Sequence, residues 1–134
     1  MKVTILFLLF CIITDLSSQN FIGLHKDSID IIIKTKEKDF KPDDFVVKKV
    51  YNYLKYVDGI NQQTWLFFLD DNDICTSTKL MSDYMNYSEV TEKLNSQHKK
   101  NGDKEWEYTD KGKTYLISLK EGDWYFTLTT KQKE

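Results

Sequence analysis

The chain has 134 residues, of which 40% are hydrophobic, and its 19 basic and 21 acidic residues leave a net charge of −2 at pH 7. This near-neutral balance excludes recruitment of nucleic acid or of an anionic membrane surface by bulk charge. Every basic residue is a lysine, so the chain has no guanidinium group for bidentate recognition of carboxylate or phosphate.

The first eighteen residues have the pattern of an export signal. Lys2 supplies a positive start, residues 3–13 are an almost unbroken apolar run, and residues 15–18 turn polar and end in small side chains. This order is typical of a secretory signal peptide (1–18), and the apolar run is too short for a spanning helix. We expect cleavage near Ser18 and Gln19, which gives a periplasmic or secreted protein.

The rest of the chain, residues 19–134, has the length of one domain, which would bury roughly two-thirds of the surface that its unfolded chain exposes. No later stretch is apolar enough to span a bilayer. Cys75 is the only cysteine left after cleavage, so an internal disulfide is excluded. Its strand-like neighbours favour a buried, inert thiol, and a reactive or intermolecular thiol is the alternative.

The first predicted element is a helix that the chain approaches through residues 23–29. Ile29, Ile32 and Ile33 fall on one face at helical spacing, although three consecutive isoleucines also suit a strand. Residues 41–44, Lys-Pro-Asp-Asp, break the chain after it.

Residues 45–57 are ambiguous between a helix and a strand. Their valines fit helical spacing, whereas the tyrosines within residues 51–56 favour a strand. We favour a strand for the second half, because Asp58 and Gly59 then form a turn into the next strand.

Residues 64–69 are apolar on both faces, which predicts an interior strand that is covered on both sides. A polar turn at residues 70–73 leads into a partner strand over residues 74–81.

A helix follows this strand pair. Asn86 and Glu89 resemble a capping box, with Asn86 capping and Glu89 reaching back. Asn101 and Gly102 predict its end. Its apolar stripe consists of Tyr87, Val90 and Leu94.

The last third predicts a meander of three strands over residues 105–108, 113–120 and 123–130. In the third strand, Trp124, Phe126 and Leu128 alternate with polar neighbours, so one face is expected to be buried and the other at least partly wet.

Residues 64–73 are echoed by residues 114–123. Both read Thr, aromatic, Leu, two variable positions, Leu and a polar turn that closes on Asp. We therefore predict an α+β fold, an antiparallel sheet with helices on one face, and we interpret it as two tandem helix-plus-three-strand units. Chance likeness of two hairpins is the alternative.

Residues 23–29, Gly-Leu-His-Lys-Asp-Ser-Ile, together with the hairpins, resemble β-lactamase-inhibitor-like proteins and the small lipoprotein domain of outer-membrane assembly machinery. His25 stands where those helices usually begin with Ser or Thr. The resemblance implies a bacterial protein-binding module that is not an enzyme, and it carries over no partner and no contact residue.

We predict no catalytic residue, no cofactor and no metal ligand. Cys75, His25 and His98 lie in no recognisable nucleophile pattern. The oxygen-rich residues 70–73 lack the spacing of a calcium loop and suit a hairpin turn better. A small secreted hydrolase or thiol enzyme with dispersed residues stays as the alternative.

Aromatic residues give the remaining functional signal, because tyrosine is enriched at interfaces as well as in small cores. We predict a non-enzymatic binding module that engages a protein or an envelope component, and its oligomeric state stays open. An apolar-ligand domain, with a cavity lined by Trp65, Phe67 and Trp124, is a further alternative. The candidate interaction surface is Tyr51, Tyr53, Tyr56, Trp65, Tyr84 and Tyr87.

Overall fold

The structure is a computed structural model that describes residues 20–43 and 52–134. The predicted signal peptide, residues 44–51 and the candidate residue Tyr51 therefore lie outside the described residues.

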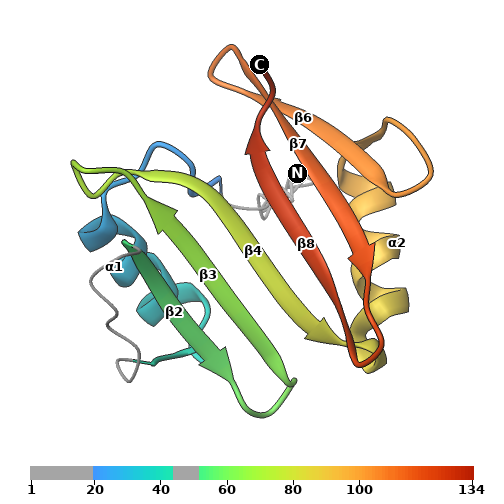
Figure 1. The fold of residues 1–134 in the computed structure, drawn as a ribbon, viewed down its shortest axis with the longest axis horizontal. Helices are drawn as coiled ribbons and strands as arrows, with labels where there is room; N and C mark the ends of the chain where they lie inside the picture. Colours follow the sequence, from blue (N-terminus) through green and yellow to red (C-terminus); the bar gives the residue numbers. More distant parts are fainter. Residues whose placement is uncertain (1–19, 44–51) are drawn as a thin grey trace, which may run out of the picture.

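The described residues form one eight-stranded antiparallel sheet with two α-helices (Figure 1). This confirms the predicted α+β class. Helix α1 spans Lys26–Lys36 and helix α2 spans Tyr87–Gln97, after a short 3-10 turn over Tyr84–Asn86. The strands are β1 (Lys41–Pro42), β2 (Tyr53–Asp58), β3 (Gln63–Leu69), β4 (Cys75–Asp83), β5 (Lys99–Lys100), β6 (Glu105–Asp110), β7 (Lys113–Glu121) and β8 (Tyr125–Gln132).

The strand order is β1-β2-β3-β4-β8-β7-β6-β5, so β4 and β8 meet in the middle of the sheet. Within each half, neighbouring strands are consecutive in the chain, and short turns join β2 to β3, β3 to β4, β6 to β7 and β7 to β8. The β4–β8 pair instead joins two segments that are far apart in sequence. In Figure 1, α1 lies with the β2–β3 half and α2 with the β6–β8 half.

Helix α1 forms because its isoleucines bury one face against the sheet. Ile29 and Ile33 are fully buried, whereas Ile31 is 63% exposed, which settles the sequence ambiguity in favour of a helix. The helix begins after His25, whose Nδ1 accepts a hydrogen bond from the Asp27 N–H at 3.2 Å. The imidazole thus performs the capping role that Ser or Thr usually performs.

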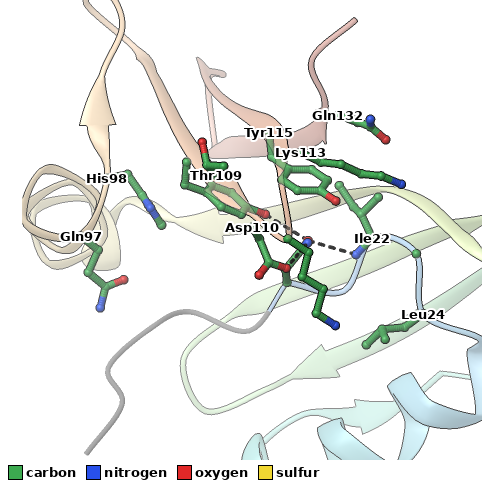
Figure 2. A pocket seen from close by; sticks show the side chains of 13 residues that line it. Ile22, Leu24, Gln97, His98, Thr109, Asp110, Lys113, Tyr115 and Gln132 are labelled. Atoms are coloured by element: carbon green, nitrogen blue, oxygen red, sulfur yellow. Dashed lines mark hydrogen bonds between the residues drawn. The ribbon is translucent and has the colours of Figure 1, made fainter. Parts of the chain in front are cut away.

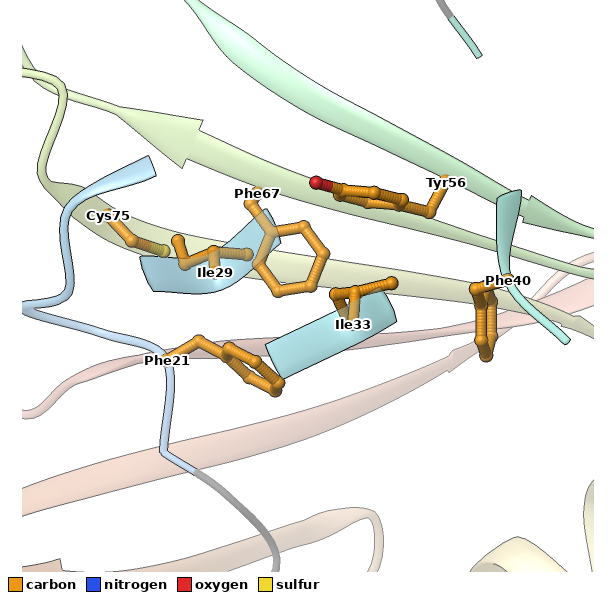
Figure 3. Close-up of a cluster of buried hydrophobic side chains, with 7 residues drawn as sticks. All are labelled: Phe21, Ile29, Ile33, Phe40, Tyr56, Phe67 and Cys75. Atoms are coloured by element: carbon orange, nitrogen blue, oxygen red, sulfur yellow. The ribbon is translucent and has the colours of Figure 1, made fainter. Parts of the chain in front are cut away.

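The first hydrophobic cluster surrounds Phe67 of β3 (Figure 3). The Phe67 ring is fully buried and meets the rings of Phe21 and Tyr56 edge-on, with centroid distances of 5.0 and 5.8 Å. Edge-on aromatic pairs are favourable beyond the area that they bury. The buried members are Phe21, Ile29, Ile33, Phe40, Tyr56, Phe67 and Cys75.

The second cluster lies between α2 and the β6–β8 strands. The predicted stripe of Tyr87, Val90 and Leu94 packs on it, which confirms that prediction. Leu80 of β4 packs against both clusters and so connects the two halves of the core. The buried members are Leu94, Trp106, Ile117, Leu119, Phe126 and Leu128.

The predicted capping box of α2 is wrong. The 3-10 turn places Asn86 in an αR conformation, and its side chain makes no capping hydrogen bond. Asp83 instead caps the turn by accepting a hydrogen bond from the Met85 N–H at 2.8 Å. The helix also ends at Gln97, before the predicted Asn101, because β5 draws the chain into the sheet beside β6.

The alternation predicted for the last strand holds for Phe126 and Leu128, which are 0% and 8% exposed, but not for Trp124. Trp124 precedes β8, in a turn where the Gly122 N–H donates to the Tyr125 carbonyl, and it is 84% exposed. A Cβ at position 122 would lie 2.8 Å from that carbonyl oxygen, so this tight turn requires glycine.

The prediction that β3 is an interior strand is confirmed, since it pairs with both β2 and β4. The predicted cover on both faces holds fully for only one face of the strand. Phe67 is fully buried, whereas Leu66 and Phe68, whose side chains point to the opposite face, are partly exposed.

Candidate functional site

A groove of about 460 Å³ crosses the middle strands of the sheet, between the end of α1 and α2. Leu80 of β4 lies directly opposite Leu128 of β8, and Thr78 lies opposite Thr130. These four side chains line the groove together with Trp65 of β3. Further apolar walls come from Phe21 and Phe40 beside α1 and from Val90 and Leu94 of α2.

The groove holds polar groups that the rest of the fold does not use. Thr78 is only 8% exposed, yet its hydroxyl makes no hydrogen bond to any described residue. The same holds for the Thr130 hydroxyl and for the indole N–H of Trp65. All three groups line the open groove, where water can satisfy them, so a bound molecule can replace that water.

The charged lining of the groove consists of Glu37, Glu89 and Lys93. Burial raises the pKa of Glu37 above its ordinary value, although the nearby Lys93 ammonium acts in the opposite direction. Asp39 and Asp58 add to the rise. The groove therefore carries one more acidic than basic side chain and is unfavourable for an anion.

A second hollow, of about 770 Å³, lies beyond one end of this groove (Figure 2). His98, Tyr108 and Tyr115 line it as successive ring contacts, with centroid distances of 4.9 and 5.2 Å. Burial lowers the pKa of His98 and raises that of Tyr108, so both rings are uncharged near neutral pH.

The start of the described chain lies between the two hollows, and Asn20 and Ile22 line both. Tyr108 Oη donates to Asn20 Oδ1 at 3.1 Å, and Asn20 Nδ2 donates to Asp110 Oδ2 at 3.1 Å (Figure 2). These bonds fix residues 20–22 to β6. The second hollow thus adjoins the first described residues of the chain.

A third feature is an apolar surface at one end of the sheet. Among the described residues, six large apolar side chains are exposed, and all but Ile31 lie in or directly beside three turns at this end. The register shows why they meet, since Gln63 pairs with Ser82 and Asp83 pairs with Tyr125. We call this surface the turn platform; it consists of Ile60, Tyr84, Met85, Trp124 and Tyr125, which are 75, 38, 65, 84 and 48% exposed.

Hydrogen bonds between turns hold the platform together. Asn86 Nδ2 donates to the Asn61 carbonyl at 2.8 Å, and the Asp83 N–H donates to the Gln62 carbonyl at 3.1 Å. The Tyr84 hydroxyl donates to the Gly122 carbonyl. These bonds connect the β2–β3 turn, the 3-10 turn and the β7–β8 turn, which lie at the same end of the sheet in Figure 1.

The predicted surface residues do not form one patch. Tyr56 is 2% exposed and donates its hydroxyl to Asp30 Oδ1 at 2.8 Å, so it belongs to the core. Trp65 lines the groove, and Tyr53 lies on the opposite face, with its ring 6.2 Å from that of Phe68. Tyr84 belongs to the platform, and Tyr87 beside it donates to Glu121 Oε1 at 2.8 Å.

The sequence prediction missed Ile60, Met85, Trp124 and Tyr125. The available signal was their position, because Ile60 follows Asp58-Gly59 directly and Trp124 follows Gly122-Asp123. Turns are normally polar, so large apolar side chains in neighbouring turns indicate an interaction surface.

The groups for a thiol mechanism do not assemble. His25 lies in the segment that pairs with Ile74, next to Cys75, but its Nδ1 caps α1. Cys75 is 1% exposed, and its Sγ donates to the Ser77 carbonyl at 3.5 Å. Among the described residues, no three His, Cys, Asp or Glu side chains gather as they would around a metal ion.

We expect Cys75 to be almost inert in the folded protein. Burial raises its pKa from 9.0 to about 11, which lowers the thiolate fraction at pH 7 about a hundredfold. Titration of the mature chain, residues 19–134, with a chromogenic disulfide reagent should proceed only as fast as the protein unfolds, and it should become rapid once guanidinium has unfolded the protein. A fast native reaction would reopen the thiol-enzyme alternative.

Comparison with protein-family models, with curated proteins and with solved structures finds no significant match to this chain. Within residues 20–43 and 52–134, neither helix has the length and apolar character needed to cross a membrane.

Proposed function

We propose that the protein is an exported, non-enzymatic binding module that docks through the turn platform onto another protein. The observation that carries this proposal is the concentration of exposed apolar side chains on three joined turns. Single apolar side chains on a surface are ordinary, but five of them on neighbouring turns at one end of the sheet favour an interaction site. Trp, Tyr and Met are also the residue types enriched in protein interfaces.

The rigidity of the platform supports the same function. Asn86 and Tyr84 connect their turns by hydrogen bonds, and the Asp58 carboxylate accepts hydrogen bonds from the N–H groups of Ile60 and Asn61 at 2.9 and 3.0 Å. Association then orders few additional groups, which reduces its entropic cost.

Charge around the platform indicates the chemistry of the partner. Asp83 precedes Tyr84 and Asp123 precedes Trp124, whereas the nearby Glu121 is already paired with Lys104 at 3.3 Å. Carboxylates in these positions disfavour anionic lipid headgroups and favour an apolar protein patch with lysine or arginine at its rim.

The export signal and the repeated architecture complete the proposal. The order α1-β2-β3-β4 recurs as α2-β6-β7-β8. We interpret these as two copies of one helix-plus-three-strand unit, whose helices share the sheet face that carries Phe67 and Ile117. This arrangement leaves the ends of the sheet for recognition, and the export signal brings the module to partners in the periplasm or outside the cell.

The platform predicts a site-specific crosslink in the envelope of the native host. With the photoreactive residue p-benzoylphenylalanine in place of Trp124, we expect one predominant protein adduct. Ile31 provides the matched control, because it is also large, apolar and exposed but lies on α1, and the same replacement there should give no such adduct. The double variant Ile60→Ser and Met85→Ser should weaken the Trp124 adduct at least tenfold.

Equal adduct patterns from positions 124 and 31 would contradict docking through the platform. Adducts with lipid alone would contradict a protein partner. Circular dichroism of each variant verifies that the sheet is intact, so that loss of an adduct reports on the surface and not on folding.

A further inference from the structure

We propose that the groove between α1 and α2 is a second, separate site, which binds an uncharged elongated apolar molecule carrying one hydroxyl or carbonyl group. It shares none of the five platform side chains, so the two proposals stand or fall independently. Its volume of about 460 Å³ lies within the range of small-molecule sites.

The shape of the site follows from the way the sheet is built. The β4–β8 pair joins the two halves, and each helix covers the core cluster of its own half. Leu80 and Leu128 at the junction form the apolar floor, and Phe40 and Leu94 face it from the two sides. Apolar surface in this position gains free energy when a hydrocarbon chain displaces water from it.

Thr78 is the most buried polar residue of a lining that also includes the amides of Asn61, Gln63, Asn86 and Gln97, so its hydroxyl is the deepest polar contact for a ligand. Thr78 is more than nine-tenths buried, lines the groove and makes no hydrogen bond to any described residue. The Thr130 hydroxyl opposite it and the Trp65 indole N–H offer one further donor each. A hydroxyl can both donate and accept a hydrogen bond, and an indole N–H can only donate one. Two hydroxyls and one indole N–H therefore suit a hydroxyl or carbonyl oxygen of the ligand.

The charges of the lining exclude a carboxylate as that oxygen. Glu37 and Lys93 oppose one another across the groove, and Glu89 adds a further negative charge. An anionic head would meet two carboxylates and one ammonium, without any guanidinium group, whereas an alcohol or ketone is indifferent to this balance. The ligand that fits is a neutral amphiphile, such as a medium-chain alcohol.

The test compares three ten-carbon probes that differ only in the head group: 1-decanol, decanoate and decyltrimethylammonium. Isothermal titration of the protein, with Trp65 fluorescence as a second readout, should show saturable binding of 1-decanol at least tenfold tighter than of either ion. Trp65→Phe should remove the fluorescence change, because Trp106 is buried and Trp124 lies on the platform, and it should weaken the heat signal, because the groove loses the indole N–H.

Thr78→Val identifies the hydrogen bond. This substitution keeps the shape and removes the hydroxyl, so we expect decanol binding to weaken fivefold or more while the fold is retained. Thr127→Val is the matched control, because Thr127 pairs with Met81 on the same two strands and its side chain points to the opposite sheet face. It should leave decanol affinity unchanged.

Three results would overturn the proposal. The first is the absence of saturable decanol binding, and the second is decanoate or decyltrimethylammonium binding as tight as that of decanol. The third is equal effects of Thr78→Val and Thr127→Val. A self-association constant that changes with Thr78→Val, without any decanol binding, would assign the groove to a second copy of the chain.

Discussion

Replacing Phe67 with alanine is expected to lower the free energy of unfolding by about 3–5 kcal/mol. The Phe67 side chain is fully buried and touches the rings of Phe21, Tyr56 and Trp65, with centroid distances of 5.0, 5.8 and 5.0 Å. Its removal leaves a cavity between α1 and the sheet that these rings fill only in part. Denaturation in urea, followed by circular dichroism, measures the change.

Phe68→Ala is the matched control for this experiment. Phe68 is the next residue of β3, but its side chain points to the opposite face, where it is partly exposed near the Tyr53 ring and the Lys79 ammonium. We expect it to cost about 1 kcal/mol. Equal losses of unfolding free energy for Phe67→Ala and Phe68→Ala would mean that the core does not lie on the sheet face that carries Phe67.

The sequence predicted the hairpins well because their information is local. Alternation of apolar and polar residues indicates β8. The turn at Gly112 separates β6 from β7, and the turn at Gly122 separates β7 from β8. The β4–β8 pairing brings Leu80 opposite Leu128 across almost fifty residues of chain, roughly a third of its length, and no local pattern encodes that register. The groove is a product of this pairing, so it could not be predicted.

The tyrosine surface illustrates a different limit. Residues 53 and 56 differ by an odd number of positions, so a strand must send their side chains to opposite faces. Tyr56 can then be buried because its hydroxyl donates a hydrogen bond to Asp30 of α1, a contact between elements that composition does not reveal. Enrichment in tyrosine identified the right kind of residue for a surface, whereas strand periodicity decides which of them reach it.

Asp58→Asn is expected to destabilise the protein by about 3 kcal/mol at pH 7. Asp58 is 1% exposed, and its two oxygens accept hydrogen bonds from the Ile60 N–H, the Asn61 N–H and Asn61 Nδ2, the last at 2.7 Å. An asparagine at this position would bring a second amide N–H group toward the Asn61 amide, or leave one turn N–H without an acceptor. Urea denaturation at pH 7 measures the loss.

The same carboxylate makes stability depend on pH in acid. Burial acts to raise the pKa of Asp58, but the three N–H donors outweigh it and hold the pKa below the ordinary 3.8. Because the folded-state pKa is the lower one, the stabilisation is complete above pH 3.8 and is lost as the pH falls through the folded-state value. Asp58→Asn should therefore flatten the decline of stability below pH 4, to about the extent that this one group contributes.

Asp71→Asn, in the exposed β3–β4 turn, controls for the general effect of removing one negative charge. It should leave the stability at pH 7 and the decline of stability in acid almost unchanged.

Asp58 also fixes the turn that presents Ile60 on the platform, so Asp58→Asn should weaken the Trp124 crosslink even where the protein stays folded. An unchanged crosslink together with the predicted loss of stability would mean that the β2–β3 turn supports the fold but takes no part in docking.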